Sequence, residues 1–247
     1  MHWTAFGQSV VGTSHSKRNA PCQDAFCLQV FGPNDDWLAI AAADGAGSAS
    51  YSAIGAALTA SELVKRAVRA QPASLLTRDT LEALYGEVRN TLHAQAEFLR
   101  VAPRELASTA ILAIVGPSSA SFAQLGDGGI VVRQDSTYRL VFWPETSEYV
   151  NATDFLTDHR SLSAIRFERS DIPVLEIAVF TDGLQRLVID YAQRAPYPGF
   201  FGPLFTDLHI SKSIHTLIPP LRALLQSEKV NRRTDDDKTI VLAVRQP

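Results

Sequence analysis

The chain of 247 residues contains 46% hydrophobic and 20% charged residues and carries a formal net charge of −3 at pH 7. This composition is typical of globular proteins, and the length can bury a sizeable core without disulfides or a structural metal. Length alone fits one large domain or two small ones. Because no basic field would draw the molecule onto nucleic acid or anionic lipid, the sequence predicts neither kind of partner.

The two cysteines, Cys22 and Cys27, are too few for a secreted disulfide scaffold, and their spacing matches no zinc pattern. We expect reduced thiols in a cytoplasmic protein. The N-terminal residues 1–4 lack a basic start followed by an apolar stretch, so no signal peptide is expected. The longest clean apolar run, residues 37–43, is far too short to span a membrane.

Three strands followed by two helices are expected in the first part of the chain. The strands are expected at residues 3–11, 25–30 and 37–43, and the last ends abruptly in Asp44-Gly45-Ala46-Gly47-Ser48. Apolar residues then recur at helical spacing over residues 51–70 and again over residues 79–100.

A stretch rich in short apolar strands follows the second helix. These strands are expected at residues 109–115, 120–124, 129–134 and 138–142, with a hairpin turn at 116–119. A less regular segment is expected from residue 144 to about residue 171. The remaining pattern predicts a strand at 174–180, a short helix through Tyr191, a loop at 196–199, a helix at 211–226 broken or started by Pro219-Pro220, and a strand at 239–244.

Strands and helices therefore come in blocks rather than in βαβ alternation. This order predicts an α+β fold in which a sandwich of two sheets is flanked by helices. The chain contains no internal repeat, low-complexity tract or obvious interdomain linker.

Four aspartates share one local pattern. Asp44, Asp127 and Asp182 each follow a strand-like run and precede a glycine, and Asp236 lies just before the last strand. The glycine lets the backbone or a ligand approach closely. A single Asp-Gly is commonly a turn in which the aspartate accepts backbone hydrogen bonds. Three such junctions together with an acidic triplet are harder to explain by turns alone.

Carboxylates gathered at one end of a sheet would repel one another unless cations compensated their charge. Oxygen ligands without an organised set of histidines or thiolates suit hard ions, so the pattern favours Mg²⁺ or Mn²⁺ over Zn²⁺. Two such ions can activate a bridging water and polarise a phosphoryl oxygen.

The chain resembles the PPM/PP2C family of protein serine/threonine phosphatases, and its bacterial members in particular. The resemblance spans nearly the whole chain and keeps the order of the family's motifs. The matching segments are Gln23-Asp24-Ala25, Asp44-Gly45-Ala46-Gly47, Ala107-Ser108-Thr109-Ala110, Gly126-Asp127-Gly128, Phe180-Thr181-Asp182-Gly183-Leu184 and Asp236-Asp237-Lys238-Thr239.

This resemblance implies a four-layer α/β/β/α sandwich formed by residues 1–247 as one domain. It implies metal-dependent hydrolysis of phosphoserine or phosphothreonine in proteins, without a phosphoenzyme intermediate. It also implies a phosphorylated protein substrate, an opposing serine/threonine kinase and a bacterial signalling role.

The resemblance further implies how the acidic residues share two Mg²⁺ or Mn²⁺ ions and a third, weaker one. Asp44, Asp182 and Asp236 would hold the first ion and carry catalysis. Asp44 and the carbonyl of Gly45 would hold the second, with Asp24 nearby. The third site would use Asp127 together with Asp182.

Several residues depart from the family's pattern. Gln23 replaces a common glutamate, and Ala46 replaces a histidine proposed elsewhere as general acid. The register puts Asn19 at the usual position of the phosphate-binding arginine, so we assign that role to Arg18. His15 could supply the proton instead, since histidine suits proton transfer, or it could be a surface or packing residue.

Two flanking segments have open interpretations. Residues 151–158 could line the substrate side of the site or form a capped turn, and Arg232-Arg233 could attract phosphate or balance local charge. Two alternatives to a protein phosphatase also stay open. Gln23 and Ala46 favour a catalytically weak module that binds phosphoproteins, and the sequence equally fits a hydrolase of small phosphate esters.

Overall fold

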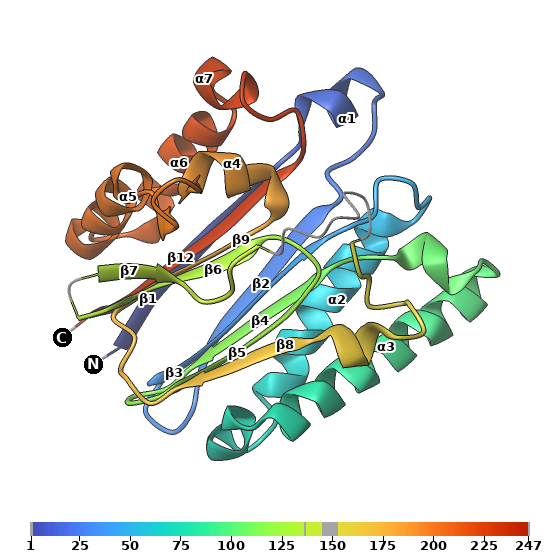
Figure 1. The fold of residues 1–247 in the computed structure, drawn as a ribbon, viewed down its shortest axis with the longest axis horizontal. Coiled ribbons are helices and arrows are strands. Elements are labelled where there is room, and N and C mark those ends of the chain that lie inside the picture. Colours follow the sequence, from blue (N-terminus) through green and yellow to red (C-terminus); the bar gives the residue numbers. More distant parts are fainter. Residues whose placement is uncertain (1, 136, 145–152, 247) are drawn as a thin grey trace.

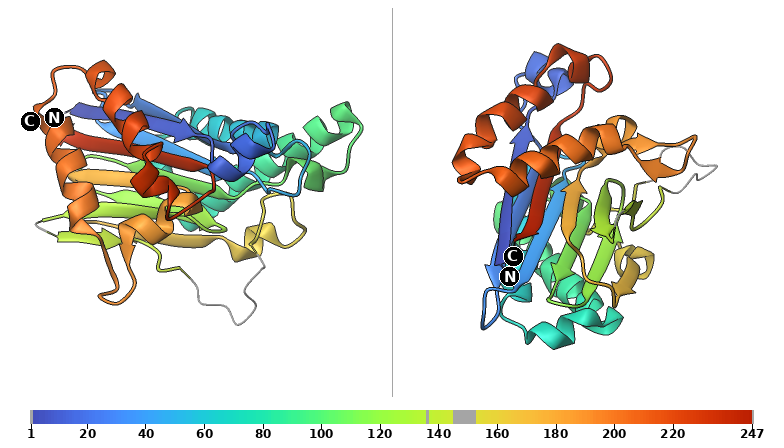
Figure 2. Two further views of the ribbon diagram at one scale, coloured as in Figure 1. Left: turned by 90° about the horizontal axis from the view of Figure 1, so that it is seen from above. Right: turned by 90° about the vertical axis from the view of Figure 1, so that its left-hand side faces the viewer.

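The computed structural model describes residues 2–135, 137–144 and 153–246. Two five-stranded antiparallel sheets pack face to face, and helices cover both outer faces (Figures 1 and 2). This is the expected four-layer α/β/β/α sandwich. No helix in the described part of the chain combines the length and apolarity needed to cross a bilayer.

The first sheet contains both ends of the described chain. Its strands, in spatial order, are β1 (His2–Val10), β12 (Lys238–Gln246), β9 (Glu176–Phe180), β6 (Gly129–Gln134) and β7 (Thr137–Leu140). The second sheet has the order β2 (Asp24–Phe31), β3 (Trp37–Asp44), β4 (Ala110–Val115), β5 (Ala120–Leu125) and β8 (Arg166–Ser170). Gly116 and Ser119 close the hairpin between β4 and β5, as the sequence predicts.

Strand β3 shows how the layers are held together, because it is buried on both faces. Its Leu38 and Ile40 point into the core between the sheets. The alternating residues Ala39 and Ala41 face the helical layer, where their small side chains let a helix approach closely.

Two long helices cover the second sheet, α2 (Ser52–Ala67) and α3 (Arg78–Leu99) (Figure 1). Thr77 caps α3 by accepting a hydrogen bond from the N–H of Thr80, and Arg100 ends it in the left-handed region. Shorter helices cover the first sheet. They are α4 (Gln185–Val188), α5 (Pro198–Ile210) and α6 (Ile218–Leu225). Helix α7 (Glu228–Asn231) follows α6, and α1 (Thr13–Lys17) lies between β1 and β2 in the chain.

Two expectations for the C-terminal half were wrong. Residues 166–170 form the edge strand β8 within a segment expected to be irregular. The loop expected at 196–199 is instead the end of the small hairpin of β10 (Ile189–Asp190) and β11 (Ala195–Pro196), followed by the start of α5. The helix expected over 211–226 is present from Ile218 to Leu225. It is started by the proline pair, one of the two expected outcomes, because proline suits a first helical turn better than a helix interior.

Candidate active site

The predicted acidic residues meet at one end of the sandwich because neighbouring strands are antiparallel. Asp24 begins β2 and Asp44 ends β3, and the two residues pair directly across these strands. In the other sheet, β12 begins beside the end of β9, so Asp236 and Asp182 come to the same end. Antiparallel pairing therefore gathers four carboxylates that lie far apart in the sequence.

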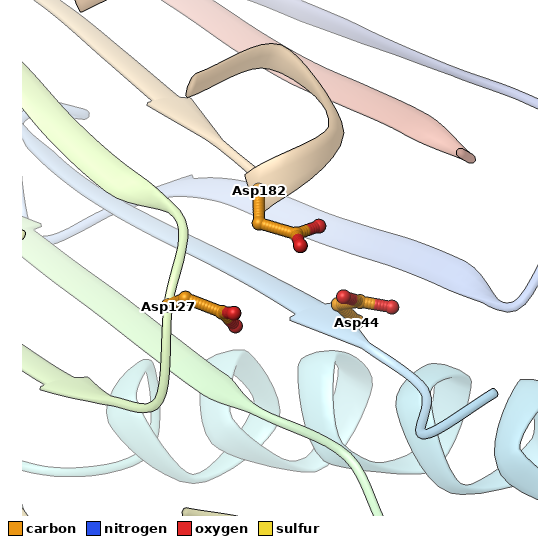
Figure 3. Close-up of side chains that lie close together, drawn as sticks. All are labelled: Asp44, Asp127 and Asp182. Atoms are coloured by element: carbon orange, nitrogen blue, oxygen red, sulfur yellow. The ribbon is translucent and has the colours of Figure 1, made fainter. Parts of the chain in front are cut away.

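Three carboxylates form the centre of this group. Asp44, Asp127 and Asp182 each offer an oxygen atom, and these atoms all lie within 4.8 Å of one another. Figure 3 shows the three side chains converging from separate strands and turns. Asp44 comes from the second sheet and Asp182 from the first, so the group bridges the two halves of the sandwich.

Asp127 lies in a tight turn where the chain crosses from one sheet to the other, between β5 and β6. The flanking Gly126 and Gly128 have φ angles of +81° and +93°, which side chains rarely adopt. A Cβ atom at Gly128 would lie 2.6 Å from the carbonyl oxygen of Phe180. The two glycines therefore let the turn press against the end of β9, which carries Asp127 toward Asp182.

Asp24 lies behind this centre and is buried. Its carboxylate accepts a hydrogen bond of 2.6 Å from the hydroxyl of Thr181. Burial raises the pKa of Asp24 to about 7, and the nearby charge of Asp237 adds to this effect while the Thr181 hydrogen bond opposes it.

Burial and the charges of neighbouring carboxylates also raise the pKa values of the central carboxylates. Burial, followed by the charges of Asp127 and Asp236, raises the pKa of Asp182 to about 7. Burial and the charges of Asp24 and Asp182 raise the pKa of Asp44 well above its ordinary range. Such a group is unfavourable as bare anions, and bound cations would relieve the repulsion.

The donor set fits divalent cations that prefer oxygen. Oδ1 of Asp127 is buried without a hydrogen-bond partner among the described residues, and Oε1 of Gln23 is in the same situation. Both residues line the pocket in front of the carboxylates. Carboxylate and amide oxygens are the ligands that Mg²⁺ and Mn²⁺ accept, so the residues fit the ions that the sequence predicts.

Asp237 has a structural role that sequence reasoning missed. Its buried carboxylate accepts hydrogen bonds from the backbone N–H of Gly12 at 2.6 Å and of Gln23 at 2.5 Å. Its Oδ2 also lies 2.8 Å from Nδ1 of His15. Asp237 thus fixes both ends of the segment between β1 and β2 against the start of β12. In the sequence it is one member of a triplet, and only its burial separates it from Asp235 and Asp236.

The chain matches known proteins over most of its length. The family model for protein phosphatase 2C matches residues 11–218. Serine/threonine-protein phosphatase 3 of Escherichia coli (strain K12) is 36% identical over 250 residues, which cover 99% of each chain. This chain belongs to the protein phosphatase 2C family. The recognition made from the ordered motifs is therefore confirmed.

Solved phosphatase structures share the fold. A bacterial serine phosphatase superposes with a TM-score of 0.68 at 16% identity, covering 99% of this chain and 98% of the other. The serine/threonine phosphatase Stp1 from Staphylococcus aureus gives a TM-score of 0.67 at 16% identity, covering 100% and 96%. PppA of Pseudomonas aeruginosa gives 0.64 at 17% identity, covering 99% and 98%.

The pocket in front of the acidic group has a volume of about 360 Å³ and contains most of the predicted residues. Asp44, Gly45, Asp127, Asp182 and Asp236 line it. Asp236 lies outside the closest group of three, although its charge acts on both Asp127 and Asp182. Asp24 is buried behind the pocket instead of lining it.

The remaining lining residues include the two to which the sequence analysis gives a role toward the substrate. His15 and Arg18, from the segment around α1, both face the pocket. The lining also contains Phe155 and Thr153, and the hydroxyl of Thr153 lies 3.3 Å from Oδ2 of Asp127. These two belong to the segment 151–158, for which the sequence left open a place on the substrate side of the site or a capped turn. Residues 151 and 152 of this segment lie outside the described part of the chain.

Proposed function

We propose that this phosphatase hydrolyses phosphoserine and phosphothreonine in proteins with the help of two Mg²⁺ or Mn²⁺ ions and a third, weaker one. The observation that carries the proposal is the convergence of Asp44, Asp127 and Asp182, with oxygens within 4.8 Å of one another, in an open pocket. Bound there, the cations would supply an activated water and polarise the phosphoryl group.

The acidic residues would divide this task by position. Asp44 and Asp182 would carry the greatest share, because they come from opposite sheets and face each other across the centre. Asp236 would complete the first ion's ligands, the carbonyl of Gly45 would contribute to the second, and Asp127 would serve the third. Asp24 would act from behind by adding negative charge, since it is buried outside the pocket lining.

Two residues around α1 would handle the substrate. Arg18 is exposed at the pocket and would bind the phosphate, because a guanidinium matches phosphate oxygens in geometry and charge. His15 would donate the proton to the leaving serine or threonine oxygen. Its Nδ1 faces Asp237, so the proton would come from Nε2.

A phosphate-release assay tests the proposal and separates it from the alternatives. We expect turnover of a phosphothreonine peptide with Mn²⁺ or Mg²⁺, none with EDTA, and a loss of at least about a thousandfold in Asp182→Asn. Asp235→Asn is the matched control, because Asp235 is exposed and lines no part of the pocket. Retained binding of the phosphopeptide without turnover in any metal would instead support the binding module.

The substrate class is tested in the same assay. For each substrate, kcat/KM is divided by the rate of its uncatalysed hydrolysis. For a protein phosphatase, this ratio should be higher for the phosphothreonine peptide than for p-nitrophenyl phosphate. Equal ratios for the two substrates would support a hydrolase of small phosphate esters.

The cellular setting follows as a further part of the proposal. We place residues 1–247 in the cytoplasm as one catalytic domain that opposes a serine/threonine kinase. The free Cys22 and Cys27 fit a reducing compartment.

A further inference from the structure

A second pocket lies beside the active site on the helical face of the first sheet. Its volume is about 610 Å³, and it is bounded by α4, the β10–β11 hairpin, α5, α6 and α7. The lining combines apolar side chains, including Tyr191, Tyr197, Leu204 and Leu224, with basic ones. Tyr191 and Tyr197 are about half exposed, at 46% and 51%, so this apolar lining is open to a ligand.

The rim of this pocket is positively charged. Arg186, Lys229 and Arg233 line it, against a single acidic residue, Asp190. All three basic side chains are exposed, and none forms an ion pair with a carboxylate within residues 2–135, 137–144 and 153–246. Arg232 differs, because its guanidinium pairs with Glu228 at 2.5 Å. The charge-balance reading of Arg232-Arg233 therefore holds for Arg232, with Glu228 as its partner, whereas Arg233 belongs to the pocket.

Two short segments connect this pocket directly to the metal site. Arg186 follows Asp182 by four residues through a 3₁₀ turn and α4, which places it about 6 Å further along the helix axis. Arg233 precedes Asp236 by three residues, a span of at most roughly 11 Å. A peptide whose phosphorylated residue lies in the active site would thus reach this pocket with residues about three to five positions away.

We infer that this pocket docks the segment of the phosphoprotein substrate that flanks the phosphorylated residue. It selects substrates that carry an aromatic or large aliphatic residue next to aspartate or glutamate. The apolar lining receives the large side chain, and the unpaired cations on the rim attract the acidic neighbours. This inference rests on the proposed function, because it takes the phosphoprotein as the ligand.

Peptide kinetics test the inference. Three phosphothreonine peptides are compared with Mn²⁺: one with Phe-Asp-Glu placed three to five residues away, one with Phe-Lys-Lys there, and one with alanines. Each is made with the segment on the N-terminal and on the C-terminal side. We expect kcat/KM about tenfold higher for Phe-Asp-Glu than for alanine on one side, and no gain for Phe-Lys-Lys.

Surface variants assign the preference to this pocket. Lys229→Glu and Leu224→Asp should each abolish most of the tenfold preference, whereas Arg232→Glu, a matched exposed neighbour, should keep it. p-Nitrophenyl phosphate is too small to reach the pocket, so its turnover by all three variants should stay within about twofold of the wild-type value. This control shows that the variants are folded. Equal kcat/KM for all peptides, or a preference that survives both pocket variants, would overturn the inference.

A binding measurement keeps this test independent of catalysis. The unphosphorylated, fluorescently labelled Phe-Asp-Glu peptide should bind the wild-type protein about tenfold more tightly than Lys229→Glu, as measured by anisotropy. If no peptide is turned over but this difference is found, the proposed function fails and the docking pocket stands. A dimer in sedimentation that Leu224→Asp dissociates would assign the pocket to self-association and contradict the inference.

Discussion

Thr181 joins the two sheets by donating a hydrogen bond of 2.6 Å from its hydroxyl to the buried carboxylate of Asp24. The same oxygen accepts the backbone N–H of Thr239 at 3.0 Å. Asp24 begins β2 in one sheet, and Thr181 follows β9 in the other. Because Asp44 pairs with Asp24 and Asp182 follows Thr181, this contact sets how the two halves of the acidic group face each other.

Removing this contact should destabilise the fold. Thr181→Val keeps the shape of the side chain but removes the hydroxyl that donates to the buried carboxylate of Asp24 and accepts from the backbone N–H of Thr239. We expect the free energy of unfolding to fall by about 1–3 kcal/mol in denaturant titrations with EDTA. Thr181→Ser retains the hydroxyl and is the control. A valine variant as stable as the serine variant would show that the contact contributes little.

Neutralising one carboxylate should stabilise the protein while it abolishes activity. In Asp44→Asn the repulsion from Asp24 and Asp182 is relieved, so the melting temperature in EDTA should rise, by an amount equivalent to about 1–3 kcal/mol. The same variant should lose the increase in melting temperature that Mn²⁺ gives the wild type. A lower melting temperature in EDTA would contradict the electrostatic account.

The stability of the metal-free protein should fall as the pH rises toward neutrality. The pKa values of Asp24 and Asp182 are about 7 in the folded protein and close to 3.8 when unperturbed. Each group therefore binds its proton more tightly in the folded state. Its contribution to stability is complete below about pH 4, declines between about pH 4 and 7, and is lost above that range.

Melting curves with EDTA and with Mn²⁺ at about pH 5 and pH 8 measure this effect. We expect the shift caused by Mn²⁺ to be larger at the higher pH, where the cation no longer competes with protons for the carboxylates. Asp182→Asn should show a shallower dependence on pH in EDTA. A metal-induced shift that is the same at both pH values would argue against cation binding by this group.

The role of His15 as a proton donor is tested by comparing two substrates with different leaving groups. Serine and threonine oxygens need a proton as they leave, whereas p-nitrophenolate does not. His15→Ala should therefore lower kcat/KM for a phosphothreonine peptide by roughly a hundredfold or more, and that for p-nitrophenyl phosphate by less than about tenfold. Equal losses on both substrates would show that His15 only holds the loop through Asp237.

Much of the sandwich and most of the pocket follow from the sequence, for identifiable reasons. Buried strands such as β3 have uninterrupted apolar runs, and Asp44, Asp127 and Asp182 each stand where such a run meets a glycine. Antiparallel pairing then brings these strand ends together, which the residue pattern alone does not encode. The family resemblance supplied that missing step.

The elements that were missed have misleading local chemistry. The edge strand β8 carries Arg166 and Glu168, whose charges suit an exposed edge and hide a strand pattern. In α5, Phe201, Phe205 and Leu208 do recur at helical spacing, and Pro198 is a favourable first residue. The internal Pro203 and two glycines obscured that signal.

The second pocket was invisible in the sequence for a different reason. Its wall comes from five separate elements, and three of these, α5, α7 and the β10–β11 hairpin, were not expected. Arg233 could be noticed only as part of an Arg-Arg pair. Arg232 pairs with Glu228 whereas Arg233 lines the pocket, a difference that only the structure defines.

Anomalous scattering from a crystal soaked in Mn²⁺ tests the central claim most directly. We expect strong peaks between Asp44 and Asp182, with a weaker one at Asp127, and the loss of the strong peaks in Asp182→Asn. A crystal without any manganese among these carboxylates, from protein that still releases phosphate in EDTA, would contradict the account.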